Sequence, residues 1–302
     1  MVEKKLYDFV DPADAECVRR ETEETLHEFF PGYDKTLFKD SFEAVQNLFF
    51  GLYPGYRASN TKYHDFEHTC SVVLADARLI YGAMLEGHTF SEKEATRGLL
   101  AALFHDVGLI QTEDDTQGTG AKHTVGHEER SIQFMREFLE GRISEESIED
   151  IADCIRCTIL AMAPAKIAFR TDNMRILGHI LGTADLLAQI ADRYYLEKLL
   201  LLFQEFQEAK LPGYDTAFDL LSKTKDFYQH VAKKRMNNDL GQVDRFMKPY
   251  FKKRWGLDAD LYETAITANL DYLDGILSGC GGDLDCFLKG LRRGGISVDI
   301  LS

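Results

Sequence analysis

The sequence has no long apolar run and no alternating pattern of the kind that predicts strands. No stretch approaches the roughly eighteen uninterrupted apolar residues of a membrane-spanning helix. The first ten residues, MVEKKLYDFV, contain no apolar segment of signal-peptide length. We therefore expect neither a membrane span nor a secretory signal, and a cytoplasmic location.

Cysteine is also scarce. Six cysteines among 302 residues are too few for a disulfide framework at this length. Cys154 and Cys157 have the spacing of half a zinc knuckle, but the chain has no second pair of that kind. Because they lie in the apolar run IADCIRCTILAM, we expect them to be buried, reduced thiols.

Positive charge is in the minority. The chain has 35 basic and 50 acidic residues, a formal net charge of −15, and its acids are spread along the sequence. Such a field repels nucleic-acid backbones and anionic membranes, so neither is an expected partner. The short basic clusters KKRMNN and KKRW are interpreted as solvated helix faces. An anionic substrate would need bound cations or a few placed basic residues.

Helical periodicity runs through almost the whole chain. Ser91 and Glu94 form the pattern of a capping box before EKEATRGLLAALFHD. Further helices are expected over 67–85, 123–141 and 144–162, and the run 171–209 predicts two helices or one with a bend. Residues 111–120 predict a loop, and the glycine-rich tail from Gly279 is expected to dock loosely or fray. The predicted fold class is all-α.

Two histidines share one helical face near the start of the helix expected over 67–85. His64 and His68 stand four residues apart in YHDFEH, so their Cβ atoms would lie about 5–6 Å apart on a helix. Such a pair could bind a metal together, could consist of one general acid and one metal ligand, or could lie on the solvent-exposed surface. The pair alone does not decide between these.

Acids interrupt two apolar helices. His105 and Asp106 end an apolar helix in LFHDVG, and Asp185 lies within ILGTADLLAQI. A buried carboxylate without a partner is costly, so these positions call for a cation, an arginine or water. A lone buried Asp is a structural cap or a member of an ion pair as often as it is a functional residue. Imidazole and carboxylate together, however, suit zinc or harder, six-coordinate ions.

The ordered set His68, His105-Asp106 and Asp185 resembles the H…HD…D pattern of the HD-domain metal-dependent phosphohydrolases. It is most similar to the class I cyclic-nucleotide phosphodiesterases, in which the first motif reads Tyr-His-Asn-x-x-His. The later runs ADLLAQI and QEFQEAKLPGYDTAFDLLSKTKDFYQHV also look like that family, and the resemblance covers roughly residues 40 to 235.

The resemblance implies a fold, a metal centre and a reaction. It implies an HD-type helical bundle over 41–236, between an N-terminal helical segment, 1–40, and a helical C-terminal extension, 237–302. His68, His105, Asp106 and Asp185 would bind one or two divalent ions per chain (Zn, Mn, Fe, Ni or Mg), with Asp106 able to bridge two. His64 would be the general acid that protonates the leaving alkoxide, which answers why two histidines share one turn.

Three departures from the family pattern matter. The family's Asn after its acid histidine is Asp65 here. Its Glu in the helix after HD is replaced by His127, which we interpret as a direct ligand of a second ion, whereas His123 is expected on the loop surface. The glutamine that clamps a purine falls at Thr224, and Gln229 is one helical turn away, so the argument for purine recognition fails at its key residue.

Two other functions compete with hydrolysis. The HD-fold di-iron oxygenases also resemble H…HD…H…D but use a further histidine, and the helix expected over 145–162 contains none. Only Asp150 or Asp153 could stand in for it. A non-catalytic HD module that holds metal and senses a ligand is the second alternative. The cyclic-di-GMP branch is disfavoured, because neither His-His-Glu nor Gly-Tyr-Pro follows the HD pair.

The expected reaction is hydrolysis of a phosphodiester or phosphomonoester. The expected partner is a small, nucleotide-like phosphorylated substrate, and a homo-oligomer is left open. The candidate phosphate contacts, each more typical of a surface charge, are Lys122, Arg170, Arg175 and Arg193.

Overall fold

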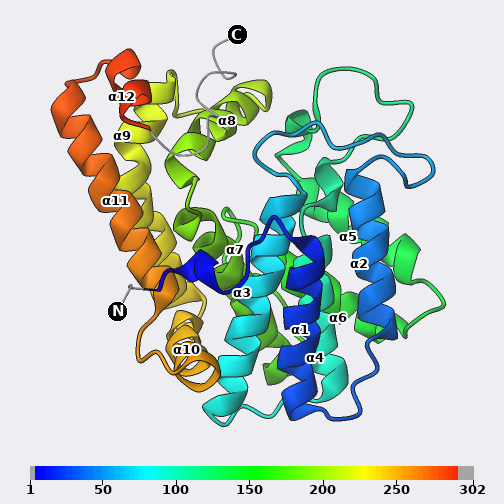
Figure 1. The fold of residues 1–302 in the computed structure, drawn as a ribbon. Helices are drawn as coiled ribbons and strands as arrows, with labels where there is room; N and C mark the ends of the chain where they lie inside the picture. Colours follow the sequence, from blue (N-terminus) through cyan, green and yellow to red (C-terminus); the bar gives the residue numbers. More distant parts are fainter. Residues whose placement is uncertain (1–3, 292–302) are drawn as a thin grey trace.

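The computed structural model describes residues 4–291, and within that range the protein consists of α-helices joined by loops (Figure 1). The described residues form no strand, only an isolated bridge between Tyr56 and Thr112. The expectation of an all-α fold is confirmed. The twelve α-helices are α1 (Ala15–Phe29), α2 (Thr36–Phe49), α3 (Phe66–Leu85), α4 (Glu92–Phe104), α5 (His127–Leu139), α6 (Glu145–Arg156), α7 (Asp172–Ala191), α8 (Tyr195–Glu208), α9 (Ala217–Phe227), α10 (Met247–Trp255), α11 (Leu261–Cys280) and α12 (Leu284–Gly290).

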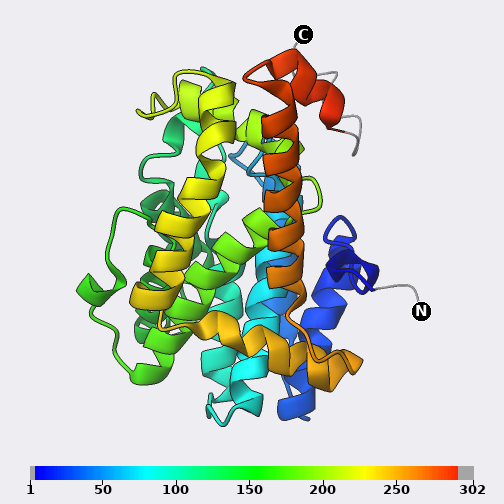
Figure 2. The same cartoon turned by 90° about the vertical axis from the view of Figure 1, so that its left-hand side faces the viewer.

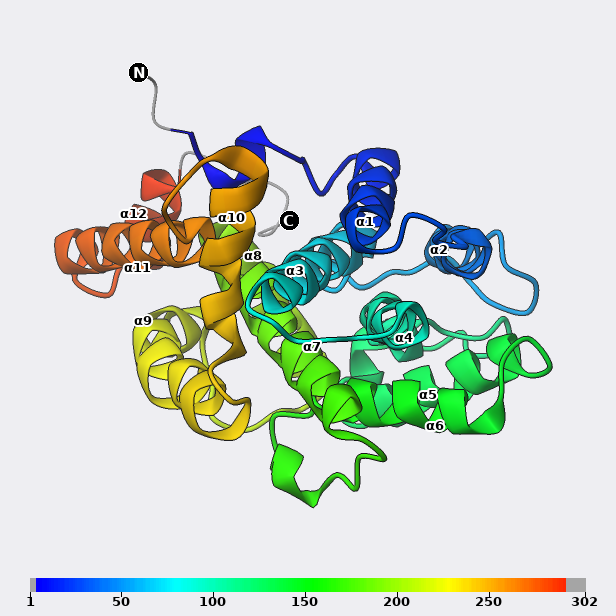
Figure 3. The same cartoon turned by 90° about the horizontal axis from the view of Figure 1, so that it is seen from below.

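Helices α3 and α7 pack against each other at the centre of the molecule (Figure 3). Helix α4 contacts both, α1 and α10 pack on α3, and α6 and α11 pack on α7. From Phe66 to Ala83, nearly every residue of α3 is buried. A helix that is apolar all round belongs in the interior. Polar side chains on α3 and α7 therefore point into protein, where they need partners.

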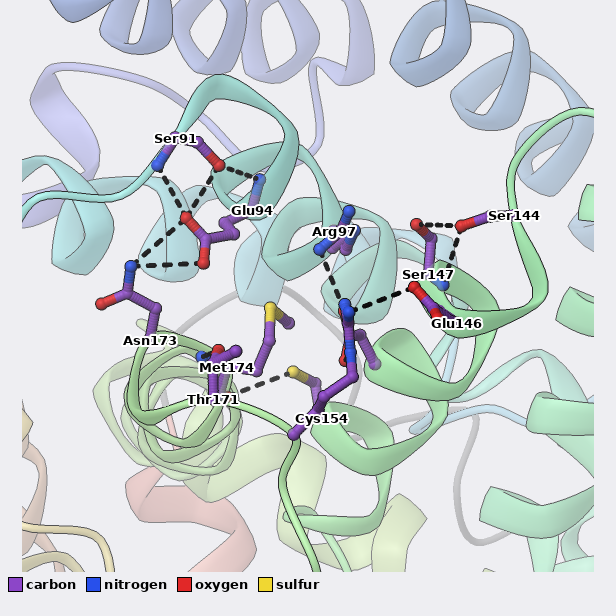
Figure 4. A network of polar contacts seen from close by, with 12 residues as sticks. Ser91, Glu94, Arg97, Ser144, Glu146, Ser147, Cys154, Thr171, Asn173 and Met174 are labelled. Carbon is purple, nitrogen blue, oxygen red and sulfur yellow. Dashed lines mark hydrogen bonds and ion pairs between the residues drawn. The ribbon is translucent and has the colours of Figure 1, made fainter.

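The start of α4 has the predicted capping box. Ser91 N donates to Glu94 Oε2 at 2.8 Å, and Glu94 N donates to Ser91 Oγ at 3.3 Å. Glu94 also accepts from the Asn173 side chain at 3.2 Å, which joins the first turns of α4 and α7 (Figure 4). A local sequence signal and a long-range contact thus fix the same helix end.

The helix expected over 144–162 is shorter than predicted, because α6 ends at Arg156. The cause is Arg235, which comes from a distant part of the chain. Its guanidinium donates to backbone carbonyls at 2.9–3.2 Å. The acceptors belong to Cys157, Ile159, Leu160 and Met162. Arg235 is buried, so the solvated face predicted for KKRMNN is wrong at this residue.

Two other boundaries were only partly predicted. The run 171–209 forms two helices, α7 and α8, with a break at 192–194. Helix α5 begins at His127 rather than at 123, because residues 120–123 form a short 3-10 helix and Gly126 takes a positive φ of 87°. Residues 111–119 form the predicted loop.

Both ends of the described chain join one core, which extends from Leu6 to Leu291. Helix α11 packs on α7 and α9 (Figures 2 and 3). The expectation of a loose tail is wrong for residues 284–290, which form α12 with Phe287 buried, and residues 292–302 lie outside the described part. Among residues 4–291, no helix has both the length and the hydropathy of a membrane span.

The cysteines follow the prediction in part. Cys154 and Cys157 are buried and free, as expected. Cys280 and Cys286 form a disulfide across a separation of six residues, between the last residue of α11 and α12. The low cysteine count gave no indication of this single bridge.

Candidate metal centre

Four helices bring the predicted ligands together. Asp65 is the N-cap of α3 and accepts from His68 N at 2.9 Å, which places His68 in the first turn of that helix. His105 is the C-cap of α4 and Asp106 follows it. Asp185 lies on α7. His127, the first residue of α5, comes from the fourth helix.

Asp106 is the common neighbour of these side chains. Its Oδ2 lies 3.1 Å from His105 Nε2 and 3.4 Å from His68 Nε2. Its other oxygen, Oδ1, lies 3.2 Å from His127 Nε2. Asp185 Oδ1 lies 3.4 Å from His68 Nε2 and 3.8 Å from His105 Nε2. All five side chains that were singled out as metal ligands therefore lie in one cluster, with His127 on one side of Asp106 and His68 and His105 on the other.

The donor atoms fit a cation. One ligand atom from each of His68, His105 and Asp185 lies within 4.8 Å of the others. His105 Nε2 and Asp106 Oδ2 are fully buried, and although they lie 3.1 Å apart, neither makes a hydrogen bond of good geometry. Because orphaned buried polar atoms are costly, these atoms fit a site in which an ion satisfies both. The group could hold a metal ion.

Two of the rings are oriented by backbone carbonyls. His105 Nδ1 lies 2.8 Å from the Ala102 carbonyl, and His127 Nδ1 lies 2.8 Å from the Thr124 carbonyl. Each Nδ1–H therefore donates outward, and each Nε2 faces Asp106. A second partner of this kind is typical of histidines that bind metals.

The charges at the centre depend on one another. Burial alone would raise the pKa of Asp106, but His105 and His127 outweigh it and hold the pKa well below its usual range. Burial likewise opposes ionisation of Asp185, yet its pKa is lowered by His68 and His105. Two ionised carboxylates facing several imidazoles form a site whose stability requires positive charge, from protons or from a metal.

A glycine lets α5 approach the His-Asp turn. A Cβ added to Gly108 would lie 2.0 Å from the His127 carbonyl oxygen, so only glycine fits at this position. Ser131 Oγ donates to the His105 carbonyl at 2.6 Å and accepts from Gly108 N at 2.8 Å. These contacts hold His127 next to Asp106.

His64 faces the same centre and is held by a carboxylate that the sequence did not reveal. His64 Nδ1 lies 2.6 Å from Glu205 Oε2, and Glu205 Oε1 accepts from Tyr63 N at 2.7 Å. The His64 ring centroid is 5.7 Å from that of His68 and 6.4 Å from that of His127. Burial would lower the pKa of His64, but Glu205 outweighs it and raises the pKa to about 9.

Helix α8 also anchors the loop that follows the HD motif. Glu208, one turn after Glu205, accepts from both Thr119 N and Thr119 Oγ1 at 2.5 Å. Asn60 donates to Gln111 Oε1 and accepts from Gly120 N, each at 2.9 Å. The two loops that border the centre are therefore tied to each other and to α8.

Asp76 is a second buried acid that sequence reasoning missed. It is 0% exposed, and neither carboxylate oxygen has a hydrogen-bond partner. Burial raises the pKa of Asp76 well above its usual range, opposed only by the charge on His105. The visible signal was an acid inside SVVLADARLIY, eight residues after His68 and so on the same face of α3.

The raised pKa of Asp76 predicts a pH-dependent effect of Asp76→Asn. Above about pH 4 the unfolded chain ionises Asp76 while the folded chain keeps it protonated, so this residue lowers wild-type stability as pH rises. The variant should gain in free energy of unfolding relative to wild type by up to about 1.4 kcal/mol per pH unit. Urea unfolding at pH 4.5 and 7.5 measures this, with exposed Asp226→Asn as the control. A difference independent of pH would mean that folded Asp76 ionises normally.

The remaining candidates lie in structural contacts. Thr224 is buried and its hydroxyl donates to the Leu220 carbonyl within α9. Gln229 is exposed. His123 lies 3.0 Å from Asp115 and is half-buried, so the expected loop surface is only partly correct.

The candidate phosphate contacts and the two candidate oxygenase ligands are all paired with opposite charges. Lys122 pairs with Asp115, Arg170 with Asp150 and Glu146, Arg175 with Asp172, and Arg193 with Asp11. Asp150 also accepts from Arg97, and Asp153 from Arg156. In each of these pairs the cation contacts an acid outside the metal centre.

A comparison with models of known protein families gives a match. The model of the Npun_R2479-like family matches residues 52–248, more than half of the chain. The protein belongs to this family. The matched segment of this Npun_R2479-like chain contains all the residues of the candidate metal centre, together with His64 and Glu205. No curated protein matches the chain.

Proposed function

We propose that the protein is an HD-type, metal-dependent phosphohydrolase that resembles the phosphodiesterases and hydrolyses a small, nucleotide-like phosphoester. The observation that supports this most is the position of Asp106. One of its oxygens faces His68 and His105, and the other faces His127. A carboxylate whose two oxygens face different histidines is suited to bridge two ions, as two-metal phosphohydrolysis requires.

His68, His105, Asp106 and Asp185 would hold the first ion, and Asp106 with His127 would hold the second. A divalent ion held there supplies Lewis-acid chemistry, which activates water near neutral pH and offsets negative charge on phosphoryl oxygens.

The protein's own residues supply the proton and its direction. Glu205 holds the His64 ring by its Nδ1, so the Nε2–H is the donor available to a leaving oxygen. A pKa of about 9 keeps His64 protonated at neutral pH. A positioned general acid of this kind typically contributes about 10²–10⁴-fold to a rate.

The substrate side of the proposal rests on charge and on Thr224. The four candidate phosphate-binding cations are each paired with an acid, so a phosphate would be neutralised at the metal centre. Thr224 directs its hydroxyl to its own helix backbone, which fits a substrate that is not selected through a purine clamp at that position.

A di-iron oxygenase is the second candidate, because His127 meets the third position of its pattern beside Asp106. The acids that would have to replace its further histidine are engaged elsewhere, Asp150 by Arg97 and Arg170, and Asp153 by Arg156. This favours hydrolysis over oxygen chemistry. A metal-holding sensor shares the same centre without turnover.

One experiment separates these functions. The purified protein, supplemented in turn with Zn, Mn, Fe, Ni and Mg, is screened against cyclic nucleotides, nucleotides and aryl phosphates while oxygen uptake is recorded. Phosphate or nucleotide release that depends on metal would support the proposal. Oxygen uptake with redox-active iron would support the oxygenase, and bound metal without either activity would support the sensor.

His127→Ala tests the second ion. The Nε2 atom of His127 faces Oδ1 of Asp106, and not the oxygen that faces His68 and His105. The variant should therefore lose about one equivalent of metal and keep the ion near His68 and His105. Elemental analysis of wild type and variant measures this, with His123→Ala as a matched control on the preceding 3-10 helix. Unchanged stoichiometry in His127→Ala would make this residue a structural cap of α5.

A further inference from the structure

A second unusual polar group lies apart from the metal centre, where α3 meets α10 and α11. Arg78 is 1% exposed, and its Nη1 donates to Tyr262 Oη at 3.0 Å. Its Nε and Nη2 are also buried, and neither has a hydrogen-bond partner. The guanidinium stays charged, because its pKa is above the range of any buffer. The function proposed above uses none of these atoms.

Aromatic rings surround this charge instead of acids. The guanidinium carbon lies 5.5–5.7 Å from the ring centroids of Tyr250, Phe251 and Tyr262. Such contacts favour a cation but do not neutralise it. Among residues 4–291, Arg78 forms no ion pair with a carboxylate, although a buried charge ordinarily has one.

Two acids beside the tyrosines of this region already have partners. Glu21 accepts from Tyr250 Oη at 3.0 Å and pairs with Arg254 at 3.2 Å. Burial and the charge of Asp192 raise the pKa of Tyr7, and Asp192 pairs with Lys198 at 2.6 Å. Neither carboxylate contacts Arg78, so the positive charge is left to another partner.

A small cavity lies beside the guanidinium. Its accessible volume is about 10 Å³, which is room for one water molecule or one monatomic ion. Arg78 and Tyr262 form its polar wall, and most of the remainder is apolar. The full lining is Leu6, Tyr7, Val10, Pro12, Ser71, Leu74, Arg78, Ala188 and Tyr262.

The polar groups around the cavity are arranged for an anion. Tyr262 accepts from Arg78, so its own O–H remains a donor, and the Nε–H and Nη2–H groups of Arg78 have no acceptor. Ser71 donates to the Glu67 carbonyl at 2.9 Å, and Tyr7 to the Ala191 carbonyl at 3.2 Å, so their hydrogens are used. A water molecule could accept from these donors, but it would leave the guanidinium charge without a counter-ion.

We propose that this cavity binds chloride, held by the guanidinium of Arg78 and the hydroxyl of Tyr262. A monatomic anion fits the space, which phosphate, sulfate and carboxylates exceed. The site joins residues 6–12, α3, α7 and α11, so the ion would fasten the first residues and the C-terminal helices to the central helix.

Bromide, which replaces chloride in such sites, provides the deciding test. Crystals of the full chain grown in sodium bromide should give an anomalous difference peak between Arg78 and Tyr262, and crystals of Tyr262→Phe should give a weaker one. A peak without anomalous signal would identify a water molecule and overturn the proposal. No peak in wild type would overturn it equally.

Thermal unfolding in chloride at constant ionic strength, balanced with sodium methanesulfonate, gives an independent readout. Above the dissociation constant, each tenfold rise in chloride should raise the midpoint by roughly 2–4 °C. Tyr262→Phe should shift this dependence to higher chloride. Arg78→Met should abolish it, and the exposed Arg175→Met is the matched control. Equal chloride dependence in wild type and Tyr262→Phe would contradict the role given to the hydroxyl.

Discussion

Replacing His105 or Asp106 by alanine is expected to remove most of the bound metal and to abolish hydrolysis. The purified wild-type protein should carry one or two divalent ions per chain. His105 and Asp106 each present a buried donor atom without a hydrogen-bond partner to the same point, so each substitution removes a ligand together with its geometry. We expect activity to fall by at least about 10³-fold, since the ions supply both nucleophile activation and charge neutralisation.

Elemental analysis and the hydrolysis assay should be run on the same preparations. His230→Ala is a suitable control, because His230 has a side chain 73% exposed and lies on the segment after α9. It should change neither metal content nor rate. Full metal occupancy in both His105→Ala and Asp106→Ala would refute the assignment of the centre. Lost metal with retained activity would refute the proposed function alone.

His64→Ala is expected to keep the metal and to lower turnover by about 10²–10⁴-fold on a substrate with a poor leaving group. His64 contacts Glu205 and not the acids of the metal centre, so removing it should leave the ligands in place. An aryl phosphoester leaves as a stable phenolate and needs little protonation, so its rate should fall much less.

The role of His64 as general acid also predicts the direction of the pH dependence. Glu205 raises the pKa of His64 to about 9 against the opposing effect of burial. Activity on the poor leaving group should therefore hold through neutral pH and decline as pH rises through about 9. The pair's contribution to stability should likewise be complete below the unfolded pKa of about 6.5 and be lost on passing through the folded one.

Glu205→Gln tests whether His64 is a general acid or a group that only positions phosphate. Without the carboxylate, the largest effect that opposes burial and raises the pKa of His64 is lost. The alkaline decline should therefore move to lower pH while metal content stays unchanged. An unmoved pH profile would contradict the role of Glu205. Equal losses on both substrates in His64→Ala would mean that His64 only positions the phosphate, and loss of metal would make it a ligand.

The sequence by itself determined the fold class and pointed to the residues that the structure brings together. Helical periodicity depends on neighbours three and four residues apart, so it can be read locally, and the Ser91–Glu94 capping box was predicted for the same reason. His105 and Asp106 stood out as polar residues at the end of an apolar helix, and Asp185 as an acid inside one, anomalies that are visible before any contact is known.

Only the tertiary structure decided the partners. Glu205 holds His64 from 141 residues away, and its surroundings in FQEFQEA are those of an ordinary surface acid. Arg235 ends α6 by donating to carbonyls 73–78 residues earlier in the chain. Arg78 and Asp76 were hidden within an apolar run that gave no indication of which neighbours they meet. A hydrogen bond or a missing counter-ion depends on what packing places within about 3–4 Å, and that distance is set by the whole fold.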